Sequence, residues 1–427
     1  MLKFGEDNET VTNEHERVIL VGAQLEGQDI SYSMSELAGL AQAAGAEVIG
    51  EAVQNLEKVN TATFIGRGKV DELADYCSAM KADAVIFNEE LSGIQTRNLE
   101  KALKTRVIDR TVLILDIFAL RAKTKEGKLQ VELAQLQYLM PRIAGFDKSL
   151  SRQAGGIGTR GPGETQLETD RRHYIRRMDS IRSELKRMKK TRTTTRKQRE
   201  RSGIPVVALV GYTNAGKSSL MNRMLLEAGR VNKDVYEEDM LFATLDTEQR
   251  RIKLGSTHEF ILTDTVGFVS GLPHTLIDAF KATLEEVTEA DLLLEVVDAS
   301  YEGSDFQIEV TDKVLSEIGA GGKDRITVYN KTDLTGADFI GTSTRESVNI
   351  SAKTGANIGE LLRMIEDHLF SDRETVTLMI PYDMGSLVSY ICDHGVVSSI
   401  EHTPGGTKIT AELIRKDYDM VKKYGIV

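Results

Sequence analysis

The sequence predicts a multidomain α/β protein, and three observations support this prediction. Short apolar runs alternate with helical stretches of about ten residues or more in two separate parts of the chain, a pattern typical of parallel sheets covered by helices. A long and strongly basic helical stretch separates these two parts. The chain has 427 residues, of which 41% are hydrophobic, so it can form several cores.

The same pattern divides the chain into five parts. Residues 1–16 are polar and are predicted to form a disordered tail. Residues 17–122 predict a small α/β domain with a largely parallel sheet. A helical pair with a glycine-rich loop follows over residues 123–203, and a larger α/β domain follows over residues 204–371. The larger domain has the strand and helix order of a doubly wound fold, and residues 372–427 predict a small α+β domain.

Composition indicates a cytoplasmic protein. The two cysteines, Cys77 and Cys392, lie far apart and have no metal-binding spacing, which favours a reducing compartment. No apolar run approaches the ~18 residues of a membrane span, and the polar N-terminus is unlike a secretory signal. We therefore expect a cytoplasmic protein without a transmembrane segment, with peripheral membrane association left open, and we expect it to be monomeric.

Charge is distributed unevenly along the chain. The whole chain carries a formal net charge of −11, but residues 171–201 contain fourteen Lys or Arg against three acidic residues. A basic segment on an otherwise acidic body indicates a surface for an anionic partner. We interpret it as a contact for RNA or the ribosome, and a merely solvated helix face is the alternative.

Two helices are predicted on either side of a glycine-rich loop. Residues 126–141 are rich in helix formers and are predicted to end at Pro141, and a second helix is predicted over residues 166–195. Apolar residues recur along the second helix at spacings of three and four, which is the pattern of a helix with one narrow packed face; they are Ile175, Met178, Ile181, Leu185 and Met188. The simplest arrangement is an antiparallel pair with the loop near its tip.

A phosphate-binding loop opens the larger α/β domain. Residues 211–218 read GYTNAGKS, directly after the apolar run PVVALV and before the helical run SSLMNRMLL. This G-x-x-x-x-G-K-S pattern, between a strand and a helix, lets backbone N–H groups surround phosphate oxygens at a helix N-terminus. Lys217 is expected to reach the β- and γ-phosphates, and the Ser218 hydroxyl is expected to bind Mg²⁺.

Two further motifs are placed to sense a γ-phosphate. The sequence DTVG (264–267) ends the apolar strand FILT, so the Asp264 carboxylate is expected to hold Mg²⁺ through water and the Gly267 N–H to meet the γ-phosphate. Between the two motifs, LFATLD (241–246) supplies Thr244. A threonine in this interval can close over Mg²⁺ when the γ-phosphate is present.

The last two motifs predict guanine as the base. NKTD (330–333) follows the strand RITVY, and the Asp333 carboxylate can accept hydrogen bonds from the N1–H and N2 amino groups of guanine. The stem of Lys331 can lie along the base plane. The sequence SAK (351–353) ends the next strand, where a backbone N–H can donate to guanine O6. An ATPase, the other interpretation of a phosphate-binding loop, does not explain these motifs.

These motifs together resemble the HflX family of GTPases. The resemblance rests on GYTNAGKS, LFATLD, DTVGF, NKTD and the more distinctive GPGETQLETDRR (161–172), and it covers roughly residues 17–371. It implies a GTPase that binds the large ribosomal subunit and splits stalled or idle ribosomes, notably under stress. It also implies contact with ribosomal RNA near the tip of the helical pair, within Gly155–Gly163, with phosphate pairing by Arg152, Arg160, Arg171 and Arg172.

The resemblance also implies roles for individual residues. Catalytic roles fall to Lys217, Asn214, Thr244 and Gly267, and Mg²⁺ is bound by Ser218 and Thr244. The implied GTP contacts are Gly211, Tyr212, Thr213, Asn214, Ala215, Gly216, Lys217, Ser218, Phe242, Ala243, Thr244, Leu245, Asp246, Asp264, Thr265, Val266, Gly267, Asn330, Lys331, Thr332, Asp333, Ser351, Ala352 and Lys353.

Phe268 raises the question of how water is positioned for hydrolysis. In Ras-like enzymes a Gln near this position orients the attacking water, and a phenyl ring cannot do so. Asn214 resembles the residue that helps potassium-activated GTPases to hold K⁺, and ribosome binding is the other source of the missing group. Both stay open, as does a second hypothesis for the whole chain, a GTP-dependent regulatory switch that binds a protein partner and does not split ribosomes.

Overall fold

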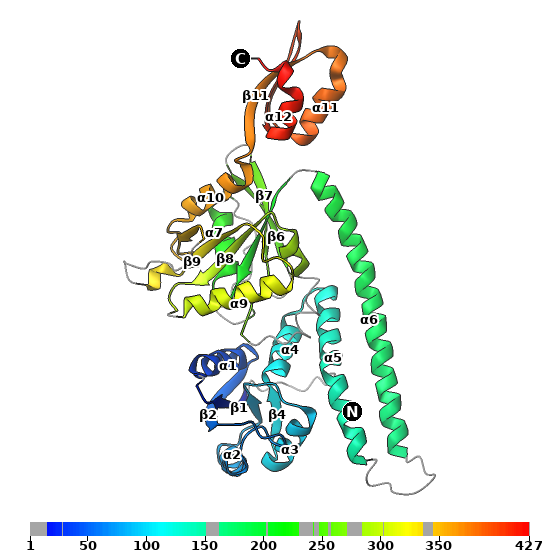
Figure 1. The fold of residues 1–427 in the computed structure, drawn as a ribbon, viewed down its shortest axis with the longest axis vertical. Helices are drawn as coiled ribbons and strands as arrows, with labels where there is room; N and C mark the ends of the chain where they lie inside the picture. Colours follow the sequence, from blue (N-terminus) through cyan, green and yellow to red (C-terminus); the bar gives the residue numbers. More distant parts are fainter. Residues whose placement is uncertain are drawn as a thin grey trace. The chain divides into compact units, whose positions relative to one another are not determined.

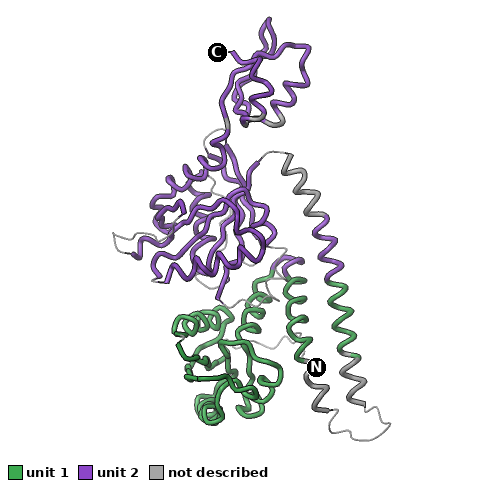
Figure 2. Tube along the Cα trace, in the orientation of Figure 1, with its two compact units in different colours: residues 1–122, 128–181 green, residues 123–127, 182–427 purple. Residues whose placement is uncertain are grey.

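The computed structural model describes residues 15–27, 29–150, 162–201, 204–229, 242, 247–254, 258–270, 284–301, 303–335 and 345–426. Three sheets, each with its own helices, follow one another along the chain (Figure 1). This arrangement confirms the predicted multidomain α/β fold. The chain separates into two compact units, residues 1–122 with 128–181 and residues 123–127 with 182–427 (Figure 2). The five-part division predicted from sequence stays a prediction.

The N-terminal domain is a parallel sheet covered by helices. Its strands lie in the order β2-β1-β3-β4, and every pair of neighbours is parallel. The chain crosses from β2 over to β3, so the switch in strand order lies between β1 and β3. The elements are β1 (Glu16–Leu25), α1 (Ser31–Ala43), β2 (Ala46–Leu56), α2 (Arg67–Met80), β3 (Ala84–Phe87), α3 (Gly93–Leu103), β4 (Arg106–Asp109) and α4 (Arg110–Arg121).

Asp109, at the end of β4, fastens several elements of this domain together. It caps α4 by accepting a hydrogen bond from the Val112 amide (3.0 Å) and also accepts the Leu91 amide (3.0 Å). The Tyr138 hydroxyl donates to the same carboxylate, and the Arg142 guanidinium pairs with it (3.3 Å). Because Tyr138 and Arg142 belong to the next helix, this buried carboxylate holds that helix to the N-terminal sheet.

The helical pair consists of α5 (Lys125–Leu150) and α6 (Pro162–Arg201). Glu132 of α5 receives two hydrogen bonds from Arg177 of α6 (both 2.6 Å), and Lys125 pairs with Glu184. Partners earlier in α5 lie later in α6, so the helices are antiparallel, as predicted. Two of the stripe residues on α6, Met178 and Ile181, are buried.

The prediction that the first helix ends at Pro141 is wrong, because α5 continues to Leu150. Proline removes one N–H from the helical ladder, which weakens a helix without always ending it. The Arg142 side chain donates to the Tyr138 carbonyl (3.0 Å) and is held by Asp109, so contacts outside the ladder support the helix at this point.

The larger α/β domain contains a six-stranded sheet in the order β10-β9-β8-β5-β7-β6. All neighbours are parallel except β6 and β7, which form an antiparallel pair. Strand β6 was not expected from its sequence, EQRRIKL, because charged residues occupy most of its positions. The elements are β5 (Val206–Gly211), α7 (Lys217–Glu227), β6 (Glu248–Leu254), β7 (His258–Asp264), β8 (Leu292–Asp298), α9 (Ser304–Glu317), β9 (Arg325–Asn330), β10 (Ser347–Asn349) and α10 (Ile358–Phe370).

The C-terminal domain is a three-stranded antiparallel sheet in the order β11-β13-β12, with two helices. Its elements are β11 (Arg373–Ile380), α11 (Gly385–His394), β12 (Val396–Thr403), β13 (Gly406–Ile414) and α12 (Arg415–Val421). His258 joins this domain to the larger one, because its two ring nitrogens lie 2.6 Å from carboxylate oxygens of Glu366 in α10 and Glu412 in β13. Across the part of the chain that the structure describes, no helix is both long and apolar enough to cross a membrane.

Candidate nucleotide site

The predicted nucleotide motifs converge at one edge of the six-stranded sheet. Strands β5, β7, β8 and β9 are parallel, so their carboxyl ends lie together. Gly211, Asp264, Asp298 and Asn330 are the last residues of these strands. In open α/β sheets this edge is where ligands bind. The fold therefore gathers four chain segments that are spread from Gly211 to Asn330 along the chain.

The phosphate-binding loop connects β5 to α7. Asn214 and Gly216 both have positive φ (60° and 91°), and α7 begins at Lys217. A Cβ on Gly216 would collide with the side-chain amide of Asn330, so only glycine fits there. The loop thus ends at a helix N-terminus, where unpaired N–H groups and the helix dipole favour an anion.

Lys217 is buried beneath this loop. Its ammonium group donates to the carbonyl oxygens of Gly211 (3.1 Å) and Tyr212 (2.7 Å). Burial lowers the pKa of Lys217 to about 8, and the nearby Asp264 carboxylate opposes this shift only in part. A phosphate would supply the negative charge that this buried cation lacks.

Ser218, at the start of α7, lies next to Asp264, the last residue of β7. The Ser218 hydroxyl donates to Asp264 Oδ2 at 2.6 Å, and Asp264 is fully buried. Thr265 anchors the segment to β5 through a hydrogen bond from its hydroxyl to the Leu209 carbonyl (2.6 Å). A hydroxyl and a carboxylate are hard oxygen ligands, so this pair fits Mg²⁺, directly or through water.

The position of Phe268 shows whether its side chain could act on the attacking water. Its ring is 2% exposed and packs in a core cluster with Val210, Leu284 and Val287, so the side chain cannot reach a nucleotide. Its backbone instead forms a parallel bridge with Tyr212. The Phe268 side chain thus packs in the core, and only its backbone takes part in the nucleotide motif.

The bridge holds the DTVG segment against the phosphate-binding loop. The Phe268 amide donates to the Gly211 carbonyl (3.1 Å), and the Phe268 carbonyl accepts from the Thr213 amide (2.7 Å). A Cβ added to Gly267 would lie 2.8 Å from Thr213 Cα and 2.9 Å from Lys217 Nζ. Gly267 therefore lies directly beside the lysine that is expected to bind phosphate, with no room for a side chain.

The base-recognition motifs are also joined to one another. Asn330 donates to the Ala215 carbonyl (2.9 Å) and accepts the Ala352 amide (2.9 Å), so it connects the phosphate-binding loop with the SAK segment. The Ser351 hydroxyl donates to Asp333 Oδ1 (2.6 Å). Four of the five motifs predicted from separate parts of the sequence thus form one continuous network. Individual contacts to a nucleotide remain predictions.

Sequence reasoning missed Asp298. This residue ends β8, and its carboxylate pairs with Lys331 Nζ at 2.7 Å while accepting the Ser300 amide (3.0 Å) and hydroxyl (2.6 Å). The pair holds the lysine whose stem is expected to lie along the base. A signal was present, because Asp298 follows the buried strand DLLLEVV at the same sheet edge as Asp264 and Asn330.

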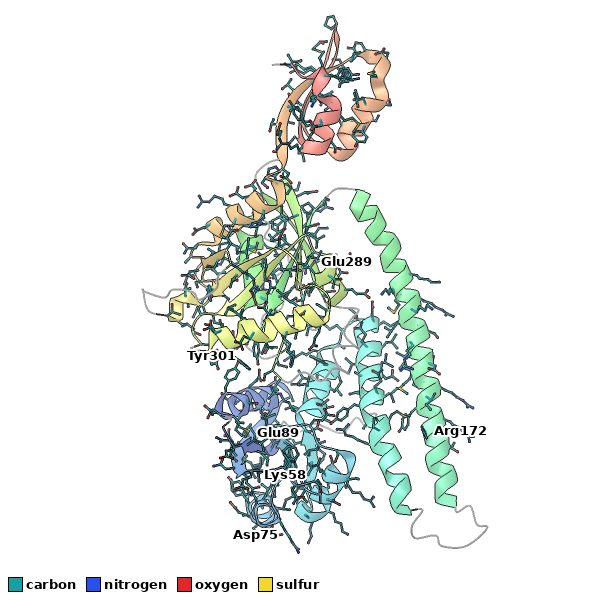
Figure 3. All side chains as sticks on the ribbon, in the orientation of Figure 1. Lys58, Asp75, Glu89, Arg172, Glu289 and Tyr301 are labelled. Atoms are coloured by element: carbon teal, nitrogen blue, oxygen red, sulfur yellow. The ribbon has the colours of Figure 1, made fainter. Side chains whose placement is uncertain are left out.

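Several predicted residues lie outside the described part of the chain. From the segment 242–246 only Phe242 is described, and it is buried with a φ of 56°. Its neighbours Ala243, Thr244, Leu245 and Asp246 are outside, as are residues 151–161, which include Arg152 and Arg160. Arg171 and Arg172 lie on α6 and are exposed, and Figure 3 labels Arg172.

Comparison with known proteins identifies the family. Three family models match in chain order: "GTP-binding GTPase N-terminal" over residues 31–119, "GTP-binding GTPase Middle Region" over residues 121–199 and "50S ribosome-binding GTPase" over residues 206–331. A curated protein named GTPase HflX from Caldanaerobacter subterraneus is 46% identical over 96% of this chain and 94% of its own length. The chain belongs to the HflX family of GTPases.

A second curated relative agrees with this assignment. GTPase HflX from Escherichia coli K12 is 43% identical over 88% of this chain and 88% of its own length. A solved structure of a GTP-binding protein from Sulfolobus solfataricus in complex with GDP is 24% identical, covers 83% of this chain and 98% of its own, and has a TM-score of 0.44. The family shows that this HflX protein is a GTPase with a ribosome-binding type of GTPase domain, and P-loop GTPases use Mg²⁺ with the nucleotide.

Proposed function

We propose that this HflX GTPase binds the large ribosomal subunit and couples GTP binding and hydrolysis to the splitting or rescue of stalled or idle ribosomes. The observation that supports this proposal most directly is the burial of Phe268. Because its ring packs in the core, the residue after DTVG offers no side chain to the attacking water. Hydrolysis then waits for a group supplied from elsewhere, as when a GTPase-activating partner completes a site.

The basic face of α6 supports a ribosomal source for that group. Arg171, Arg172 and Arg176 are exposed, as are the more C-terminal Lys186 and Arg187. Residues 171–201 carry a net charge of +11 on a chain of net charge −11, so this helix is the strongly basic part of an acidic chain. A partner rich in phosphate fits this charge distribution better than an ordinary protein surface does.

Within the site, this chain's own residues bind and orient the nucleotide. Lys217 and the N-terminus of α7 would bind the β- and γ-phosphates, and the Gly267 amide, next to Lys217 Nζ, would donate to the γ-phosphate. Ser218, hydrogen-bonded to Asp264, and Thr244 would hold Mg²⁺, which neutralises charge on the phosphate oxygens when bound. Asp333 and the SAK segment select guanine.

Potassium activation is part of the proposal. Asn214 has a positive φ of 60° in the phosphate-binding loop and is exposed. A monovalent cation held there would add positive charge near the α- and γ-phosphates. Hydrolysis faster in KCl than in NaCl, with the difference lost in Asn214→Ala, supports this role, and equal rates in both salts contradict it.

Ribosome binding is tested by measuring GTP hydrolysis with and without purified large subunits. We expect slow hydrolysis by the protein alone and a rate at least tenfold higher with large subunits. Co-sedimentation with large subunits should weaken steeply as salt rises, because phosphate contacts release counterions. Salt-insensitive binding to a protein partner, without stimulation by subunits, would favour the regulatory switch. In this account the protein works as a monomer in the cytoplasm.

A further inference from the structure

Arg223 links the phosphate-binding helix to the base-recognition loop. It lies in α7, six residues after Lys217, and is half-buried. Its Nε donates to the Ala352 carbonyl at 2.8 Å, and its Nη2 donates to the Lys353 carbonyl. The planar guanidinium thus binds two successive carbonyl oxygens of the SAK segment, a geometry that a lysine cannot reproduce.

The loop backbone packs closely on this guanidinium. A Cβ built on Gly355 would lie 3.4 Å from Arg223 Nη1 and 3.5 Å from Cζ. The loop is therefore in contact with the charged group over residues 352–355. No motif of the sequence marks Arg223, since it falls after the G-x-x-x-x-G-K-S pattern on the helix that follows.

Holding these two carbonyls also orients the amides of the loop. In a trans peptide the C=O and the following N–H point in opposite directions. Fixing the Ala352 carbonyl on Arg223 therefore turns the Lys353 N–H away from α7. Fixing the Lys353 carbonyl does the same for the Thr354 N–H, which donates to Ser351 Oγ (3.1 Å). The Ala352 amide is already used by Asn330 (2.9 Å), so the Lys353 amide is the group left to address the base.

We propose that Arg223 is a positioning residue for guanine recognition, which orients the Lys353 amide toward guanine O6 without touching the nucleotide. The proposal rests on the predicted guanine contacts of the site and not on ribosome binding. Its consequence is that α7 supports both parts of the site, because it begins at the phosphate-binding loop and carries the arginine that holds the SAK segment. A change on α7 can then alter base selectivity while leaving the phosphate contacts in place.

The test measures dissociation constants of full-length protein for two nucleotides, GDP and the diphosphate of 2-aminopurine riboside, which lacks O6 and, with it, the N1–H; the effect of a variant is compared with wild type on each nucleotide separately. Arg223→Ala should weaken GDP binding about tenfold, the loss expected for a charge-assisted pair of hydrogen bonds. The same variant should change binding of the 2-aminopurine nucleotide less than about twofold. Arg223→Lys should give a partial loss for GDP. The matched control is Arg363→Ala, since Arg363 also donates to a backbone carbonyl, that of Gly359 (3.4 Å), but lies on α10.

Each outcome decides the proposal. A loss of GDP affinity that disappears with the 2-aminopurine nucleotide supports it. Equal losses for both nucleotides would show that Arg223 only stabilises the domain, and unchanged affinities would show that it has no role in binding. If wild-type protein binds both nucleotides equally, the predicted O6 contact itself is wrong, whatever Arg223 does.

Discussion

The buried ammonium of Lys217 predicts that nucleotide affinity falls as pH rises above neutrality. Without nucleotide, burial lowers the pKa of Lys217 to about 8. Phosphate oxygens favour the charged form, so the pKa rises again when GDP binds. A group whose pKa rises on binding takes up a proton from solution, and affinity is therefore highest below the free-state pKa and declines as pH passes through it.

The magnitude follows from the fraction of Lys217 that is protonated before binding. With a pKa of about 8, that fraction is about 0.9 at pH ~7 and about 0.25 at pH ~8.5. The dissociation constant for GDP should therefore rise about fourfold between these two pH values. Proton uptake per GDP bound should rise from about 0.1 to about 0.75 over the same interval.

Isothermal titration calorimetry measures both quantities. Titrations with GDP are run at each pH in two buffers of different ionisation enthalpy, so that the difference in heat gives the proton uptake. The interval stays below the pH at which guanine itself loses a proton. A constant dissociation constant together with no proton uptake at pH ~8.5 would refute the reasoning, because it would mean that Lys217 is fully charged in the free protein.

Three further substitutions test other parts of the structure. Asp298→Asn removes the ion pair with Lys331 and should raise the dissociation constant for a fluorescent GDP about fivefold, because the pair is largely shielded from water; an unchanged constant would show that the pair does not act on the base. Tyr212→Phe removes the hydroxyl that accepts a hydrogen bond from the Ser270 amide (2.7 Å) and should lower the free energy of unfolding by about 1 kcal/mol in urea denaturation; full retention of stability would show that this hydrogen bond does not hold the segment after DTVG. His258→Ala removes the contacts of both ring nitrogens with carboxylates of Glu366 and Glu412 and should cost about 2 kcal/mol. The control His368→Ala loses one exposed carboxylate partner and should cost less than about 0.5 kcal/mol. Equal effects would contradict the proposed contact between the two domains through His258.

The sequence contained most of the information on where the site lies. Asp264 and Asn330 each follow a strongly apolar strand, and parallel strands place their carboxyl ends together, so the convergence of the motifs could be predicted. The family resemblance followed from the same residues and from GPGETQLETDRR. The order of the motifs along the chain was sufficient to predict the site, because each motif has a known chemical role and follows the carboxyl end of a strand.

Other features depended on tertiary contacts that no local pattern reveals. The bridge between Phe268 and Tyr212 is made by backbone atoms, so their side-chain letters give no sign of it. Arg223 acts on a loop about 130 positions away in the chain. The continuation of α5 through Pro141 depends on anchoring by Arg142, which only the folded structure shows.

The most direct test of the central claim is ribosome splitting followed by light scattering. Intact ribosomes are mixed with the protein in the presence of GTP, of a non-hydrolysable GTP analogue, or of GDP. The account predicts rapid loss of scattering with GTP and with the analogue, because binding drives splitting, and little change with GDP. Unchanged scattering with all three nucleotides, under conditions where the protein co-sediments with large subunits, would contradict it.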